Sequence, residues 1–511
     1  MKRKILAAIL VLGMLASLLA GCGGKGGKMP AAAQKRADAN EIAIGIAQDL
    51  DDSLDPHVAV AAGTKEVMFN VFEGLVKPTS DGNLVPAIAS DFSVEDGGLT
   101  YVFTLRQGVK FHNGKTVEMQ DVLYSIRRCA GMLPEGGEAL MPALTVIADI
   151  QGEGDKLTIT LSEPNLEFLA YMTLAILPAD YDQQATAPVG TGPFKFVSRT
   201  AQDSVVLERF DDYWGTPAKL SKVTFKIIEE DSGLVRGLQS GALDLVSHMT
   251  STQTSQLKKD EFHVEEGSMN LVQALYLNNS VKPFDDVRVR QALCYAIDKQ
   301  GIINMAFNGY GIPLGTSMFP SFAKYYDDSL TDYYPHDVAK AKELLAQAGY
   351  PNGFEMTITV PSNYQPHVDT AQVIVEQLKE VGITATIVPV EWSSWLSDVY
   401  GESKFQSTVT GLTSDNMTAR KLLERFNTQA GNNFTKYNSP AYDKLFAQAI
   451  AASDDAQQTE IYRQMERELT ENAANVYIQD MADLVAVRNG MKGLTFYPLY
   501  VLDVSTLYWD K

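Results

Sequence analysis

A strand, a helix and a second strand follow one another within residues 354–390. Residues 354–360 and 383–390 are apolar and β-branched in the manner of strands, and Ile374 to Leu378 lie in an amphipathic helix that ends at Gly382. A helix that joins two strands of one sheet nearly always crosses over right-handed and leaves the strands parallel. This part of the chain is therefore predicted to be an α/β lobe. Further helices of the same lobe are predicted at residues 285–297, 338–348, 442–451 and 457–469.

The region before this lobe has a different pattern. From Glu41 to about Asn270 short strands predominate, and residues 99–105 alternate apolar and polar side chains at period two. Asp121 stands where a helix cap is expected, ahead of apolar residues at helical spacing. A chain of 511 residues is also longer than one domain of ~100 to 200 residues. We therefore expect two lobes, and the strand-like segments 484–488 and 494–499 are expected to return to the first.

The chain begins with a targeting segment. Lys2, Arg3 and Lys4 form a basic start, and the apolar run from Ile5 to Ala20 is shorter than the ~20 residues that span a bilayer. Such a segment is typical of a secretory signal peptide, so export is predicted. The run ends in Leu19-Ala20-Gly21-Cys22, which resembles the lipobox of bacterial lipoproteins.

The lipobox resemblance implies that residues 1–21 are removed and that Cys22 is lipidated and becomes the mature N-terminus. Two or three acyl chains, at ~0.8 kcal/mol per buried methylene, would hold the protein on a membrane. Residues 22–40 are rich in Gly and Ala without an apolar period, and they are predicted to be a flexible tether. The protein is accordingly expected outside the cytoplasm, on the cell surface or on the periplasmic face of the membrane.

Charge and cysteine content exclude some classes of protein. The formal net charge is −20, and it becomes −23 without the three basic residues of the signal, which argues against a nucleic-acid partner. Beyond Cys22 the chain has Cys129 and Cys294, which are far apart in sequence and are expected to be isolated buried thiols. A disulfide between them, formed outside the cytoplasm, is the alternative.

Short phrases along the chain carry a family resemblance. They are Leu54 to His57, Phe72 to Leu75, Phe103 to Arg106, Val109 to Gly114, Gly190 to Lys195, Asp212 to Gly215, Leu277 to Asn279, Pro283 to Leu293, Ala296 to Asp298 and Ala348 to Gly353. In this order, and spread from Ile42 to Val487, they resemble the bacterial extracellular solute-binding proteins of family 5. These are the oligopeptide-, dipeptide- and nickel-binding components of ABC transporters.

The resemblance implies a two-lobed, periplasmic-binding-protein-like α/β fold of cluster C, with an extra subdomain on the first lobe. We assign residues 41–275 to the first lobe with its subdomain, 276–480 to the second lobe, and 481–511 to a return to the first. The chain crossings are expected near 275–279 and 478–485. Proteins of this kind enclose a ligand by hinge bending and present it to a permease driven by ATPases. A monomeric receptor of short peptides is therefore expected.

The predicted site centres on Asp415. In peptide-binding members of the family, the matching acid holds the ammonium group of the peptide, and two strands that flank the cleft pair with the peptide backbone. The residues matched to these strands are Gly411, Leu412 and Thr413 on one side and Gly74, Leu75 and Val76 on the other. An enclosed ammonium ion needs a carboxylate, because its burial is otherwise unfavourable by several kcal/mol. Backbone pairing accepts any side chain and suits a general peptide receptor.

Some positions depart from the family pattern. Leu412 stands where many members have Trp, and residues 416–418 lack the Asp-Pro that often follows the acid, so the side-chain pockets differ from those of the family. The alternative role of Asp415 is a helix cap ahead of residues 418–426. Four aromatic residues either line the cleft or cover the core: Trp392, Trp395, Tyr276 and Phe434.

Three other functions are open at this point. A secreted hydrolase is disfavoured because the sequence has no Gly-x-Ser-x-Gly elbow and no His-Glu-x-x-His helix, so no catalysis is predicted. A nickel or metal-chelate receptor is the alternative within the same fold. The histidines are His57, His112, His248, His263, His336 and His367. They lack metal-ligand spacing, so neither a bound metal nor a cofactor is predicted. A structural surface lipoprotein, which needs no hinge, is the third alternative.

Overall fold

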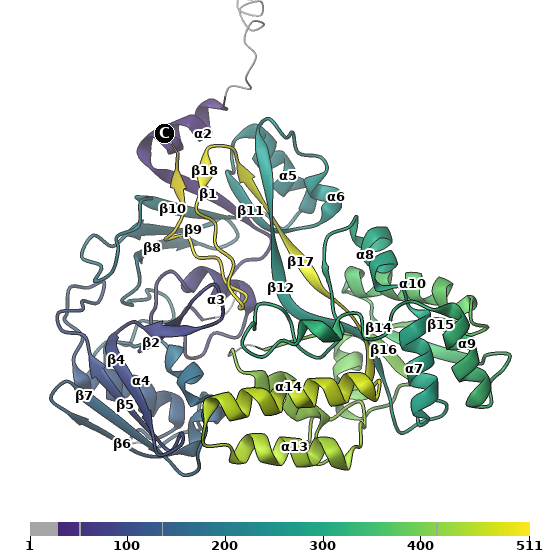
Figure 1. The fold of residues 1–511 in the computed structure, drawn as a ribbon. Helices are drawn as coiled ribbons and strands as arrows, with labels where there is room; N and C mark the ends of the chain where they lie inside the picture. Colours follow the sequence, from purple (N-terminus) through teal and green to yellow (C-terminus); the bar gives the residue numbers. More distant parts are fainter. Residues whose placement is uncertain (1–28, 51–52, 135, 415–416, 511) are drawn as a thin grey trace, which may run out of the picture.

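A computed structural model of the chain describes residues 29–50, 53–134, 136–414 and 417–510 (Figure 1). The predicted lipidation site Cys22 and the predicted ammonium anchor Asp415 lie outside the described residues. Within the described ranges, every helix is too short or too polar to cross a bilayer.

The largest sheet in the described ranges has 11 strands and extends through both halves of the molecule. Its order is β15-β14-β16-β12-β17-β11-β1-β10-β9-β8, with β13 beside β17. The strands are β1 (Glu41–Ile46), β8 (Phe194–Thr200), β9 (Ser204–Arg209), β10 (Lys222–Ile227), β11 (Leu245–Met249), β12 (Phe262–Leu277), β13 (Ile312–Pro313), β14 (Glu355–Pro361), β15 (Thr384–Val390), β16 (Ser407–Thr413) and β17 (Asn475–Arg488).

We call the part of the molecule around β1, β8, β9, β10 and β11 the first half, and the part around β14, β15 and β16 the second half. Strands β12 and β17 connect the two halves (Figure 1). Residues 262–268 of β12 pair with residues 482–488 of β17, which also pair with β11 in the first half. After a register shift between Ser268 and Val272, β12 pairs with β16 and with residues 475–480 of β17. In β12 the change of partners falls at residues 268–272, before the crossing expected near 275–279. In β17 it falls at residues 480–482, within the crossing expected near 478–485.

The second half is built around parallel strands. β14 pairs in parallel with β15 and with β16, and α10 (Gln365–Lys379) joins β14 to β15, which confirms the predicted strand-helix-strand unit. The other helices here are α7 (Val287–Ala296), α8 (Lys299–Phe307), α9 (Val338–Gln347), α11 (Trp392–Ser394), α12 (Ala419–Leu423), α13 (Pro440–Ala451) and α14 (Asp455–Glu471). Helix α7 begins where predicted, because the Asp286 carboxylate accepts the amide of Arg288.

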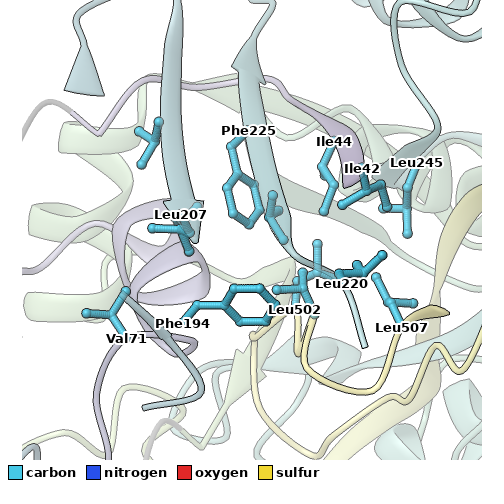
Figure 2. Packing of buried hydrophobic residues seen from close by; sticks show 14 of the residues in the cluster. Ile42, Ile44, Val71, Phe194, Leu207, Leu220, Phe225, Leu245, Leu502 and Leu507 are labelled. Carbon is cyan, nitrogen blue, oxygen red and sulfur yellow. The ribbon is translucent and has the colours of Figure 1, made fainter. Parts of the chain in front are cut away.

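The first half has its own core. Ile42 and Ile44 of β1 pack with Phe225 of β10 and Phe194 of β8, and the C-terminal residues Leu502 and Leu507 lie in the same cluster (Figure 2). Its helices include α3 (Ala62–Met68), α5 (Asp231–Ser240) and α6 (Ser251–Thr254). The prediction of a strand at 494–499 is wrong: β18 (Met491–Lys492) and β19 (Tyr508–Trp509) pair with each other on either side of that segment.

A subdomain extends the first half. Its four-stranded antiparallel sheet contains β4 (Ala89–Glu95), β5 (Thr100–Leu105), β7 (Lys156–Leu161) and β6 (Ile147–Glu153), in that order, with α4 (Met119–Ala130) packed on it. The hairpin β2 (Val76–Pro78) and β3 (Leu84–Pro86) and two 3₁₀ turns, η1 (Pro142–Val146) and η2 (Phe168–Thr173), complete it. Asp121 is the third residue of α4 and not its cap: Glu118 is the cap, and the two side chains form a capping box.

The prediction of a flexible tether over residues 22–40 is wrong for its last part. Residues Ala31–Ala39 form helix α2, with Ala33 and Ala37 buried against the first half. The Arg36 guanidinium donates to both oxygens of the buried Asp244 carboxylate, at 2.6 and 2.8 Å. Alanine favours helix formation, and this charged contact, which the sequence pattern does not reveal, holds the helix on the lobe.

Candidate functional site

A cavity of about 580 Å³ lies between the two halves of the large sheet. One wall comes from β11, α6 and β17, and the other from α8, the start of α10, Trp392 and β16. Tyr364 is the third residue after β14, and Trp392 is the second residue after β15. These are the carboxyl ends of parallel strands, where ligands bind in α/β sheets. The position of the cavity is therefore that of a ligand site.

The second-half wall is aromatic. The Trp392 ring stacks on Trp395 at 5.1 Å with an interplanar angle of 3°, and the Tyr364 ring lies 5.1 Å from Trp392. Trp395 is buried, and its indole N–H donates to the Thr408 hydroxyl at 3.0 Å. Because burial and this hydrogen bond hold Trp395 in place, the Trp392 ring that stacks on it is a rigid aromatic part of the cavity lining.

A neutral histidine borders the cavity beside this wall. His367 Nδ1 accepts from the Gln273 amide at 2.9 Å, and the Gln479 amide donates to Gln273 Oε1 at 2.8 Å. Burial lowers the pKa of His367 to about 4. The imidazole is therefore uncharged, and because Nδ1 accepts, Nε2 carries the proton.

The first-half wall carries a charged triad. His248 Nε2 lies 2.9 Å from Glu66 Oε1, and its Nδ1 lies 2.9 Å from Asp483 Oδ1. The imidazole ring also stacks on Tyr500 at 4.3 Å. Burial lowers the pKa of His248, but the two carboxylates outweigh this effect and raise it well above its ordinary value of 6.5. His248 is therefore an imidazolium, and the triad has one net negative charge.

Strand β16 offers a backbone edge to the cavity. It pairs with β12 from Ser407 to Thr413, but with β14 only at Ser407 and Thr408. Beyond Thr408, no strand of the described ranges pairs with the edge that faces β14. Gly411 lines the cavity there, and a Cβ at this position would lie 2.2 Å from Leu271 Cδ2. The open edge is suited to an extended chain that adds as a further strand.

Comparison with known proteins decides the family. The model of the bacterial extracellular solute-binding proteins, family 5 Middle, matches residues 83–434. The chain belongs to this family. The predicted family and its two-lobed α/β fold are thereby confirmed.

Individual family-5 relatives show the breadth of the group. Heme-binding protein A of Haemophilus influenzae is 28% identical over 75% of this chain and 76% of its own length. Glutathione-binding protein GsiB of Pectobacterium atrosepticum is 28% identical over 83% of this chain and 86% of its own. The periplasmic binding protein DppA of Helicobacter pylori, solved with the peptide STSA, is 27% identical, with a TM-score of 0.72 over 92% of this chain and 98% of its own.

The residues singled out from the family pattern lie in different surroundings in the structure. Gly411 and Trp392 line the cavity between the halves. Trp395, Leu412, Tyr276 and Phe434 are buried in one hydrophobic cluster of the second half. The Tyr276 and Phe434 rings lie 5.5 Å apart, and the Tyr276 hydroxyl donates to the Val272 carbonyl. For these four side chains the structure supports the core role. Thr413, the last residue of β16, is exposed.

The segment Gly74 to Val76 is not part of the lining of the cavity that Gly411 borders. Gly74 and Val76 border a different cavity, of about 290 Å³, within the first half. The Gly74 and Leu75 carbonyls accept amides of residues 87–89, and Val76 pairs with Pro86 in the β2–β3 hairpin. Leu75 is buried. Part of its backbone is therefore used within the subdomain, and its role as a strand that faces the peptide stays a prediction.

Among the cavity residues of this family-5 protein that were not singled out as ligand contacts from the sequence are Tyr364, His367, His248 and Asp483. Two signals could have found some of them. Asp480 and Asp483 interrupt an apolar strand, and a buried acid needs a partner. Tyr364 follows the carboxyl end of a predicted parallel strand. His248 has no such signal, because its partners Glu66 and Asp483 are 182 and 235 residues away in sequence.

The cysteines of the described residues, Cys129 and Cys294, are buried, free thiols, as expected. Burial raises the pKa of each to about 12, so neither is a thiolate at neutral pH. In the part of the chain that the structure describes, no cluster of His, Cys, Asp and Glu has the arrangement of a metal site.

Proposed function

We propose that this protein is the substrate-binding receptor of an ABC importer and that it captures short peptides between its lobes. The observation that carries the proposal is the open edge of β16 at the interlobe cavity. An extended peptide can pair with the backbone around Gly411, while Trp392 and Tyr364 contact its side chains. Glutathione, which the relative GsiB is named for binding, is itself a tripeptide, and DppA was solved with the peptide STSA.

Asp415 is the proposed anchor of the peptide ammonium group. It comes two residues after β16, so an acid there would meet the first residue of a peptide that pairs with the strand. The facing strand predicted from the sequence, Gly74 to Val76, is not part of this proposal. Hinge motion is proposed at residues 268–272 and 480–482, where β12 and β17 change partners. The lobe bounds 41–275, 276–480 and 481–511 remain predictions.

The receptor acts outside the cytoplasm on a lipid anchor at Cys22, without catalysis and as a monomer. The acyl chains hold the mature N-terminus on the membrane. Helix α2, which lies within the tether expected from the sequence, begins nine residues after Cys22. The permease and ATPases of the importer supply transport after the closed, loaded receptor docks.

Native mass spectrometry of the signal-free protein purified from cells tests this proposal. A spread of co-purified masses that match short peptides is expected, and Asp415→Ala should remove them, whereas the exposed Asp260→Ala should retain them. One discrete mass of a non-peptide solute or a metal chelate would contradict peptide capture. Calorimetry with nickel plus histidine then distinguishes a chelate receptor, because a peptide receptor gives no metal-dependent heat.

A further inference from the structure

The charged side chains in the described lining of the interlobe cavity are mostly acidic. It contains Asp369 and Asp483, and it contains neither Lys nor Arg. Its cation is His248, whose two ring nitrogens already contact Glu66 and Asp483. A ligand in this cavity therefore meets negative charge and has no cation of the described lining available for its own carboxylate.

Asp483 is held as a fixed acceptor in this wall. Its Oδ1 contacts His248 Nδ1 at 2.9 Å, and His248 is in turn fixed by Glu66 and by the Tyr500 ring. The side chain of Asp483 is 14% exposed. Its second oxygen, Oδ2, makes neither a hydrogen bond nor an ion pair with the described residues. Because one imidazolium faces two carboxylates, a charge remains that a ligand cation would neutralise.

The opposite wall has the surface that a long cationic side chain requires. Tyr364 is 42% exposed, and together with Trp392 it presents aromatic faces to the cavity. Phe307 and Tyr310 of the α8 region add apolar surface. Aromatic faces attract ammonium and guanidinium groups, and the methylene stem of Lys or Arg packs well on apolar surface.

We propose that Asp483 is a specificity-determining residue that binds a cationic side chain of the ligand, so that peptides with a basic residue are the preferred substrates. The inference rests on the proposed function and deepens it. Asp415 serves the ammonium group at the start of the peptide, and Asp483, on the other lobe, serves a second positive charge. Closure of the lobes brings the aromatic wall of the second half onto the aliphatic stem of the same side chain.

Titration calorimetry with matched peptides tests the proposal on the signal-free protein emptied of co-purified ligand. One peptide set carries a single lysine at each position of an alanine tetrapeptide, and the second set replaces that lysine by norleucine, which lacks the ammonium group. At least one lysine peptide is expected to bind ~10-fold or more tightly than its norleucine partner, a difference typical of one charge-assisted contact. Asp483→Asn should abolish this preference and leave the affinity for the norleucine peptide within about twofold.

Control variants separate charge from structure. Asp483→Glu keeps the charge and should retain part of the preference, and the exposed Asp260→Asn should retain all of it. Equal binding of both peptide sets by the native protein, an unchanged preference in Asp483→Asn, or loss of both ligands in that variant would each overturn the role of Asp483. Failure of the native protein to bind any peptide would instead overturn the proposed function.

Discussion

Asp480→Asn should change how the stability of this protein depends on pH. Asp480 lies on β17 at the point where β12 shifts register, and it is fully buried. Its carboxylate accepts the Ser268 hydroxyl and the Leu271 amide, the latter at 3.0 Å. No cation of the described ranges forms an ion pair with it. Burial raises its pKa from the ordinary 3.8 to about 7, although both hydrogen bonds lower it.

The direction of the effect follows from proton linkage. The folded protein keeps a proton on Asp480 up to about pH 7, whereas the unfolded chain releases it near pH 4. The contribution of Asp480 to the free energy of unfolding is therefore fully present below about pH 4 and is lost as the pH rises to about 7. At ~1.4 kcal/mol per pKa unit the shift amounts to about 4 kcal/mol, of which roughly 2–3 kcal/mol is lost between pH 5 and pH 8.

Urea unfolding of the native protein and of Asp480→Asn at pH 5 and pH 8 measures this contribution. Asparagine can still accept the Leu271 amide and can donate to Ser268, so the fold should persist. The variant should gain about 2–3 kcal/mol relative to the native protein on going from pH 5 to pH 8, and the exposed Asp260→Asn should show no such gain. If the free energies of unfolding of the variant and the native protein differ by the same amount at both pH values, the conclusion that Asp480 is protonated in the folded protein is refuted.

Three further changes test the cavity edge, the N-terminal helix and the aromatic support. Gly411→Val places a side chain against Leu271 and should weaken peptide binding ~10-fold or more by calorimetry; unchanged affinity would exclude the β16 edge as a binding strand. Arg36→Ala removes the partly buried partner of Asp244 and should cost about 1–3 kcal/mol and speed hydrogen exchange in α2; slow exchange there would mean that alanine packing alone holds the helix. Trp395→Ala should cost about 3–5 kcal/mol in urea unfolding, and a loss below about 1 kcal/mol would show that its pocket collapses readily.

The predictions that succeeded depend on neighbours in sequence. The unit β14–α10–β15 was predictable because period and helix-ending signals are local and the right-handed crossover leaves one arrangement. Asp286 marked the start of α7 for the same reason, since a cap acts on amides only a few residues away. The family phrases gave the fold because each preserves a local turn or packing contact in a fixed order.

The predictions that failed or were missing depend on distant partners. Residues 31–39 are Ala-rich with little apolar period, and the contacts that fix them on the lobe include the ion pair of Arg36 with Asp244, which is 208 residues away in sequence.

The amino-acid sequence by itself determined the two-lobed α/β class and the family, because hydrophobic periodicity and short local motifs specify them. Only the tertiary structure decided which residues face the ligand cavity. Trp392 and Trp395 are three positions apart, yet one lines the cavity and the other is core. His248 and Asp483 meet only because β11 and β17 are neighbours in the sheet. Charge and burial at a site depend on all the chain segments that converge there, and sequence spacing does not record that convergence.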